Sequence, residues 1–382
     1  MREFKCCLRG AYGPGNFGDD LLLISSLNIL ERIYDKKDIA VTVHDISKAE
    51  KFLPHYNLVP FSSPVKSEVT FLGGGGQYFS FSSNLSKKKT KFEKISSLLN
   101  SGMTLTDFIS GYYIRKRFNR RWISNHDVGF CLGLGPFENE HDRLYDLAKI
   151  ELPNFSYLSV RDSDSFKLSE SIGVRDVKKF SDPIFNSDLW KKDLNIISSD
   201  TNDVAIIIRD WPFDQSKNEL VKKLINLVPI LESKGLKPKF VSLYADYDKN
   251  VIEYFQDEGF EVITWDPVST KMDEFLSFLN SCKCIITTRA HGAIVPSMLG
   301  VPTVIINIEH KLKKVHEMLL NSSYLMELES VSDSFVWDDI IEKYLTNRLD
   351  LVSGLFVDLK RNSIESTEAA EDILNFLQSV NH

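Results

Sequence analysis

The sequence predicts an α/β fold with two Rossmann-like domains, in which two parallel sheets face a cleft. Three observations lead to this prediction. The chain has 382 residues, which suits two domains of ordinary size. Short apolar runs alternate with helical patterns, as they do in βαβ units. Glycine-rich or polar loops follow the apolar runs, and ligands bind beyond the carboxyl ends of strands in such sheets.

The apolar runs define the expected strands in chain order. Those of the first half are Phe4–Leu8, Ile39–His44, Val69–Leu72, Val128–Leu132 and Tyr157–Val160. Those of the second half are Val204–Ile208, Lys239–Leu243, Phe260–Thr264, Cys284–Thr287 and Thr303–Ile306. We therefore expect an N-terminal domain over residues 1–190 and a C-terminal domain over 191–337, with a hinge near Asp182-Pro183 and the polar stretch 191–203. Residues 338–382 are expected to form helices that pack back across the hinge.

Composition narrows the class of protein. The hydrophobic fraction of 43% and charged fraction of 26% are typical of globular chains, and the net charge of −7 argues against general nucleic-acid binding. Five cysteines are too sparse for a disulfide framework, and no ligand spacing indicates a metal site, so Cys282 and Cys284 are expected to be small core residues on strands. No stretch reaches the ~18 apolar residues of a spanning helix, and the start lacks a signal-peptide pattern, so we expect a cytoplasmic protein.

The loop Gly13–Gly18 formally matches the G-x-G-x-x-G pattern of dinucleotide sites. Asp19 and Asp20 follow at once and would repel a pyrophosphate, which argues against NAD. We expect Asp19 to be the N-cap of a helix over Asp20–Ile33. Asn16 and Asp19 are also candidates to bind a polar, sugar-like ligand.

A second glycine run, Gly73–Gly76, has two interpretations. Four free backbone N–H groups there would suit an anion, with Gly74 and Gly75 as its ligands, but the run can equally be a tight turn between packed elements. For Gly133–Pro136 the structural interpretation is preferred.

Three arginines stand at strand ends: Arg161, Arg209 and Arg289. Guanidinium groups bind carboxylate and phosphate in a bidentate manner, so a set converging on a cleft predicts an anion site. The alternative is that each forms a salt bridge between the domains. His291 lies two residues after Arg289, at the start of an expected helix over Gly292–Leu299, where it is a candidate acid or base.

The ordered set of these motifs resembles the polysaccharide pyruvyltransferase family. The matching pieces are Tyr12–Asp19, Gly73–Gly76, Gly133–Pro136, Ser159–Asp162, Asp182-Pro183, Thr288–His291 and Gly300–Pro302. The resemblance implies a fold similar to GT-B glycosyltransferases. It also implies transfer of a pyruvyl group from phosphoenolpyruvate to a saccharide, forming a ketal and releasing phosphate in cell-surface or exopolysaccharide biosynthesis.

The resemblance also assigns residues. Arg161 matches the family's first-half arginine, and Arg289 with His291 matches its arginine–histidine motif. These three are the implied catalytic residues. Apart from the resemblance, Arg209 at its strand end and Gly292 beside His291 are also expected to bind substrate. No cofactor is implied beyond phosphoenolpyruvate as donor. Two departures are Ala290, where many members carry a larger apolar residue, and Asp20, where Glu is more usual.

Residues 81–125 are rich in basic side chains, whereas the chain as a whole is acidic. Aromatic residues lie among their basic ones: Lys87, Lys88, Lys89, Lys91, Lys94, Arg115, Lys116, Arg117, Arg120 and Arg121. Such a mixture suits an anionic membrane surface or a lipid-linked saccharide acceptor, which would make the protein peripheral at the inner face of the membrane. The alternative is a solvated insertion.

Two rival functions stay open at this point. One is a GT-B glycosyltransferase that uses a nucleotide sugar. The other is a non-catalytic binding protein on the same fold.

Overall fold

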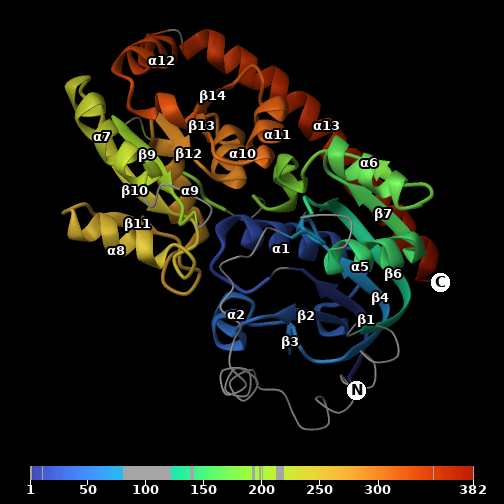
Figure 1. Ribbon diagram of the computed structural model, residues 1–382. Coiled ribbons are helices and arrows are strands. Elements are labelled where there is room, and N and C mark those ends of the chain that lie inside the picture. Colours follow the sequence, from blue (N-terminus) through green and yellow to red (C-terminus); the bar gives the residue numbers. More distant parts are fainter. Residues whose placement is uncertain are drawn as a thin grey trace. The chain divides into compact units, whose positions relative to one another are not determined.

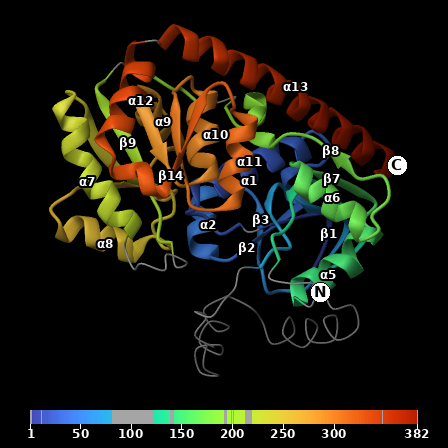
Figure 2. The ribbon, with the colours of Figure 1, turned by 45° about the horizontal axis from the view of Figure 1, so that its top comes forward.

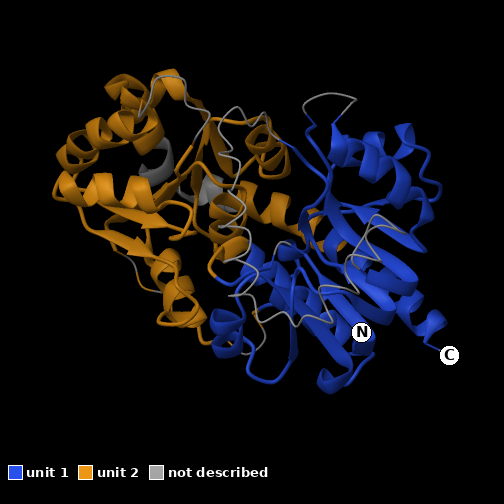
Figure 3. Cartoon of the chain, turned by 60° about the horizontal axis from the view of Figure 1, so that its bottom comes forward, with its two compact units in different colours: residues 1–14, 19–190, 365–382 blue, residues 15–18, 191–364 orange. Residues whose placement is uncertain are grey.

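The computed structural model describes residues 2–10, 12–80, 122–137, 142–191, 194–197, 199, 201–211, 219–346 and 348–381. The chain divides into two compact units (Figure 3). Unit 1 comprises residues 1–14, 19–190 and 365–382, and unit 2 comprises residues 15–18 and 191–364. Of the basic segment predicted at 81–125, residues 81–121 lie outside the described residues.

Unit 1 contains a parallel sheet in the order β3-β2-β1-β4-β6-β7-β8, with β5 paired to β6. Figure 1 labels β1, β2, β3, β4, β6 and β7 of this sheet. Its strands are β1 (Arg2–Arg9), β2 (Ile39–Val43), β3 (Asn57–Pro60), β4 (Val65–Leu72), β5 (Gly75–Gly76), β6 (Trp122–Gly133), β7 (Tyr157–Val160) and β8 (Lys178–Lys179). Strand β2 is buried along its whole length, as expected for a parallel strand covered on both faces.

Among the residues described, the helices that follow these strands are α1 (Phe17–Leu30), α2 (Ile46–Phe52), α5 (Arg143–Glu151) and α6 (Ser163–Ser171). Short 3₁₀ helices lie at Lys36–Asp38, Leu152–Asn154, Pro183–Phe185 and Ser187–Leu189. Asp162 is the N-cap of α6, because its carboxylate accepts a hydrogen bond from the Ser165 N–H at 2.8 Å. The expected start of α1 is wrong: the helix begins at Phe17, so Asp19 lies inside its first turn and is not the N-cap. An acidic side chain in a first turn still complements the helix dipole.

Unit 2 contains a second parallel sheet in the order β11-β10-β9-β12-β13-β14. Its strands are β9 (Asp203–Ile208), β10 (Lys237–Ser242), β11 (Val262–Thr264), β12 (Cys284–Thr287), β13 (Thr303–Asn307) and β14 (Ser323–Glu327). Its helices are α7 (Glu219–Ser233), α8 (Lys249–Asp257), α9 (Met272–Ser281), α10 (Ala290–Met298), α11 (His310–Met318) and α12 (Ser334–Thr346), with a 3₁₀ helix at Leu328–Ser332. The helix expected over Gly292–Leu299 is present and begins two residues earlier.

Alternate strand residues of the second sheet form its core. One face packs against α7, α8 and α12 through Val204, Ile206 and Ile286. On the other face, α10 approaches Ile207 at Gly292. Both faces are therefore apolar, as a covered parallel sheet requires.

The last helix, α13 (Arg348–Val380), is the long red helix of Figure 2. Its residues up to Ile364 belong to unit 2 and those from Glu365 onward to unit 1. In unit 1 the Asp372 carboxylate accepts hydrogen bonds from Lys178 Nζ at 2.7 Å and Tyr157 Oη at 2.8 Å. Along the residues described, no helix combines the length and apolarity needed to cross a bilayer.

The cysteines are buried and free. Cys284 lies on β12, whereas Cys282 directly follows α9 and is not on a strand. Burial raises the pKa of each of these two thiols to about 12, so both stay protonated. The prediction of small core residues on strands is confirmed for Cys284, whereas Cys282 is buried and its predicted place on a strand is wrong.

Candidate active site

The carboxyl edge of the second sheet gathers charged residues from four neighbouring strands. Arg209 follows β9 and Arg289 follows β12, while Asp248 lies in the loop after β10 and Glu309 in the loop after β13. Parallel strands end at the same edge, so these loops lie side by side. Two of the three predicted arginines thus belong to one cluster within unit 2.

Arg289 is a largely buried cation. Its Nη2 donates to Asp248 Oδ1 at 2.5 Å, and its Nε donates to the Ile208 carbonyl at 3.5 Å. Burial lowers the pKa of the guanidinium, Asp248 opposes that shift, and the like charge of Arg209 adds to it. The two arginines are therefore close enough to interact electrostatically.

Arg209 is held in a similar way. Its Nη1 donates to Glu309 Oε1 at 2.6 Å, and its guanidinium carbon lies 4.5 Å from the centre of the Trp211 ring. Its Nε is buried and has no hydrogen-bond partner among the residues described. A buried N–H of this kind is costly, and it leaves Arg209 with a donor that an anionic ligand can satisfy.

The predicted alternative for these arginines, salt bridges between domains, is wrong. Arg209 and Arg289 pair with carboxylates of their own unit, and Arg161 pairs with Asp182 of unit 1. Each arginine is therefore held in place by a carboxylate of its own unit.

His291 is the second residue of α10. A Cβ built at Gly18 would lie 2.5 Å from its Cγ and 2.8 Å from its Cβ, so only glycine fits at position 18 without moving the ring. Gly292 is confined as well, because a Cβ there would meet the Thr287 side chain and Ile207. Gly18 thus lets the N-terminal loop approach the histidine, and Gly292 lets α10 pack closely against the sheet.

The loop Gly15–Gly18 belongs to unit 2 and carries the predicted ligand Asn16. The Phe17 N–H donates to the Leu243 carbonyl at 2.9 Å, and its ring packs edge-on against Trp265 and Phe275 at centroid distances of 5.3 and 5.0 Å. Residues 15–18 of the N-terminal glycine motif therefore pack against elements of unit 2.

Arg161 lies in unit 1, at the end of β7. Its Nη1 donates to Asp182 Oδ2 at 2.6 Å, and both side chains are buried. Gly133 allows this arrangement, because a Cβ there would lie 2.8 Å from Arg161 Nη2. The matching motifs at Gly133, Arg161 and Asp182 thus form one packed group, in which Asp182 also caps the Pro183–Phe185 turn.

The glycine run Gly73–Gly76 is a close-packed segment, and the expectation of four free N–H groups is wrong. The Gly73 N–H donates to the Arg9 carbonyl at 3.2 Å, and Gly75 and Gly76 pair with β6. A Cβ at Gly74 would lie 3.0 Å from Leu22, and one at Gly75 would lie 3.6 Å from Asp19 Oδ1. The structure thus brings Asp19 and Gly75 together.

Two charged residues of this edge were not expected from the sequence: Asp248 and Glu309. The signal that could have found them is their position, since each stands in a loop directly after a strand of the parallel sheet. Among the described residues no group of three His, Cys, Asp or Glu is arranged to hold a metal ion.

A model of the polysaccharide pyruvyl transferase family matches residues 16–310 of the chain. The chain belongs to the polysaccharide pyruvyl transferase family. Family membership identifies a transferase that acts in polysaccharide modification. The matched region contains every residue predicted for the site. A search of curated proteins gave no match.

Solved structures share the fold of this pyruvyl transferase family member. Anabaena HepE in complex with UDP is 14% identical, with 98% of this chain and 100% of HepE covered and a TM-score of 0.53. UDP-GlcNAc 2-epimerase of Methanocaldococcus jannaschii, in complex with UDP-GlcNAc and UDP, is 12% identical, with coverages of 99% and 100% and a TM-score of 0.53. A putative UDP-N-acetylglucosamine 2-epimerase from Listeria monocytogenes is 11% identical, with coverages of 98% and 95% and the same TM-score. At these identities the likeness concerns the fold alone, and the predicted α/β, GT-B-like class is confirmed.

Proposed function

We propose that this family member transfers a pyruvyl group from phosphoenolpyruvate to a saccharide, forming a pyruvate ketal and releasing phosphate. The observation that carries the proposal is the arrangement of Arg289 and His291. They lie two residues apart at the carboxyl edge of the second sheet, at the start of α10 and beside Arg209. Family membership supplies the reaction class.

The charges at this edge suit phosphoenolpyruvate. The donor carries a carboxylate and a phosphate, and a guanidinium binds either group through two N–H donors. Arg289 uses Nη2 for Asp248 and Nε for the Ile208 carbonyl, and Arg209 uses Nη1 for Glu309, so each keeps further N–H donors for a ligand. The first N–H groups of α10 add donors at the positive end of the helix dipole.

In the proposed reaction phosphoenolpyruvate gains one proton and two saccharide oxygens and loses its phosphate. A proton adds to the methylene carbon of phosphoenolpyruvate, which becomes a methyl group and leaves C2 electron-deficient. Two hydroxyl oxygens of the saccharide form bonds to C2, and the bond from C2 to the phosphate oxygen breaks. One hydroxyl proton replaces the proton given to the methyl group, and the other leaves with phosphate. His291 is the proposed group that delivers or receives one of these protons, and the arginines offset the charge of the departing phosphate.

The family resemblance also assigns Arg161 to donor binding, and that assignment remains a proposal. A saccharide linked to a lipid phosphate is the acceptor that the basic segment at 81–125 favours. Contact with an anionic membrane and placement on its cytoplasmic side belong to the same proposal.

A nucleotide-sugar enzyme is the second candidate. The observation in its favour is that HepE and the M. jannaschii epimerase share the fold, and their solved structures are complexes with UDP. A thermal-shift comparison separates the candidates: we expect phosphoenolpyruvate to raise the melting temperature, and UDP and GDP to leave it unchanged. A shift with UDP alone would favour the second candidate.

The activity itself is tested by phosphate release from phosphoenolpyruvate in the presence of free and lipid-linked saccharides. We expect His291→Ala to lower the rate by about 10²–10⁴-fold, the usual contribution of a positioned acid or base. His316→Ala is the control, because His316 lies on α11 and bonds Ser323 outside the cluster. Undiminished release by His291→Ala would contradict the role of His291. Donor binding without turnover on any acceptor would favour a binding protein.

A further inference from the structure

Asp248 is a fully buried carboxylate in the unit 2 cluster. Its Oδ1 accepts hydrogen bonds from Arg289 Nη2 at 2.5 Å and from the Asp210 N–H at 3.0 Å. Its Oδ2 accepts one from Ser242 Oγ at 2.7 Å. The three donors come from the ends of three neighbouring strands, β12, β9 and β10.

Burying a carboxylate is costly unless its oxygens are paired with good donors. Here the donors are a guanidinium, a backbone N–H and a hydroxyl, so the charge of Asp248 is well compensated. An arginine side chain has several rotatable bonds, and a short contact to a buried carboxylate removes most of that freedom. The pair therefore fixes where the remaining N–H donors of Arg289 point.

Asp248 also closes the loop that joins β10 to α8. Its own N–H donates to the Tyr244 carbonyl at 2.9 Å, and the Tyr244 N–H donates to Ser242 Oγ at 3.2 Å. The same loop supplies the Leu243 carbonyl that accepts from Phe17 N–H, next to the glycine that confines His291. One carboxylate thus links the Arg289 side of the cluster to the loop beside His291.

We propose that Asp248 is a positioning residue that aims the Arg289 guanidinium at the anionic groups of the donor. The proposal rests on the function proposed above, with phosphoenolpyruvate as donor. In this role Asp248 touches no substrate and acts through Arg289. Removing the Asp248 carboxylate should therefore weaken donor binding, and should do so only while Arg289 is present.

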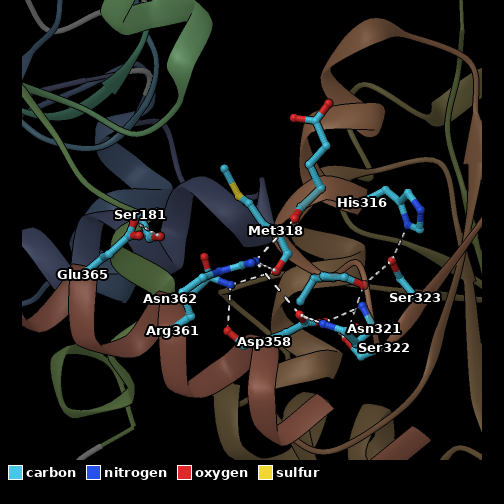
Figure 4. Close-up of polar contacts among 12 residues, drawn as sticks. Ser181, His316, Met318, Asn321, Ser322, Ser323, Asp358, Arg361, Asn362 and Glu365 are labelled. Atoms are coloured by element: carbon cyan, nitrogen blue, oxygen red, sulfur yellow. Dashed lines mark hydrogen bonds and ion pairs between the residues drawn. The ribbon is translucent and has the colours of Figure 1, made fainter. Parts of the chain in front are cut away.

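The chain offers a matched control in the same unit (Figure 4). Asp358 is also fully buried, and it accepts from the Asn321 N–H at 2.9 Å, the Ser322 hydroxyl at 2.9 Å and the Asn321 side-chain amide at 2.8 Å. It resembles Asp248 in burial and in its three hydrogen-bond donors, but it holds no predicted site residue. A loss caused merely by disturbing a buried aspartate should appear equally in both.

The test measures phosphoenolpyruvate binding by calorimetry for wild type, Asp248→Asn, Asp358→Asn, Arg289→Met and the double variant Asp248→Asn/Arg289→Met. Asparagine keeps the shape of aspartate and one acceptor oxygen, so at both positions it removes the charge and one of the two acceptors. We expect Asp248→Asn to weaken binding about tenfold to a hundredfold, the range seen when a group that orients a ligand residue is lost. The affinity of Asp358→Asn for phosphoenolpyruvate should stay within about twofold of wild type, even if its melting temperature falls as much as that of Asp248→Asn.

The double variant decides whether Asp248 acts through Arg289. We expect it to bind no more weakly than Arg289→Met alone, because coupled residues are not additive. Three results would overturn the proposal: wild-type affinity in Asp248→Asn, an equal loss in Asp358→Asn, or losses that multiply in the double variant. Absence of binding by the wild type would instead remove phosphoenolpyruvate as donor, and the proposal with it.

Discussion

Replacing Gly18 with alanine should disable His291 while leaving the fold intact. A Cβ at position 18 would overlap the His291 Nδ1 and lie 2.5 Å from the Cγ, whereas ordinary contacts begin at 3.4 Å, so the ring must withdraw by more than about 1 Å. A misplacement of roughly 1 Å can cost about 10²-fold in rate when a catalytic group must meet its substrate in one geometry. Gly18 lies in the first turn of α1, and alanine favours a helix over glycine by about 0.5–1 kcal/mol. The contact, not the backbone, is therefore the expected source of the loss.

The assay is phosphate release from phosphoenolpyruvate with a saccharide acceptor, alongside the melting temperature. Gly15→Ala is the control in the same loop: Gly15 has a φ of +130°, so alanine is strained there, but its Cβ would meet no atom within 4 Å. We expect Gly18→Ala to lose about 10²-fold in kcat at a near-normal melting temperature, and Gly15→Ala to lose stability but little kcat. Normal turnover by Gly18→Ala, or an equal fall in both variants, would refute the reasoning.

Three further predictions concern stability. Asp182→Ala leaves the buried Arg161 charge unpaired, so the free energy of unfolding should fall by about 3–5 kcal/mol in urea titrations, and an unchanged midpoint would contradict the pairing. Phe17→Ala removes a fully buried ring and should cost about 3–5 kcal/mol in the same measurement, whereas a loss near zero would mean that the loop does not pack on unit 2. Burial lowers the pKa of His44 and of His316 below 6.5, so the unfolded chain takes up protons first as the pH falls. The stabilisation is thus present above pH 6.5 and is lost as the pH falls below it. Replacing both histidines with glutamine should make the melting temperature depend less on pH between about pH 7.5 and 5. An unchanged dependence of the melting temperature on pH would show that the two histidines do not cause it.

Much of the fold could be predicted because central parallel strands are continuous apolar runs. All ten expected strands are present, with ends shifted by a few residues. The strands β3 (Asn57–Pro60), β14 (Ser323–Glu327) and the two-residue β5 and β8 were missed. Of these, β3, β8 and β14 lie at sheet edges, where a strand is only partly buried and carries a weaker apolar pattern; the edge strand β11 was predicted all the same. The start of α1 was missed for a different reason. Phe17 and Gly18 belong to the helix, but their contacts are with residues of unit 2 that lie far away in the sequence.

The candidate site was predictable to the level of strand-end residues and no further. Arg289 and His291 could be picked out because a strand, a loop and a helix start follow one another in sequence. Asp248 lies 41 residues from Arg289 and Glu309 lies 100 residues from Arg209, so only the strand order of the folded sheet brings these pairs together. The role of Gly18 depends on a contact with His291, across most of the chain.

The central claim is that Arg289 and His291 form the donor site of a pyruvyl transferase, and a crystal structure with bound phosphoenolpyruvate or an unreactive analogue tests it most directly. We predict that carboxylate or phosphate oxygens lie within about 3.2 Å of the Arg289 guanidinium. The His291 imidazole should lie within the same reach of the methylene carbon or the bridging oxygen. A ligand bound at saturating concentration away from both residues would contradict the account.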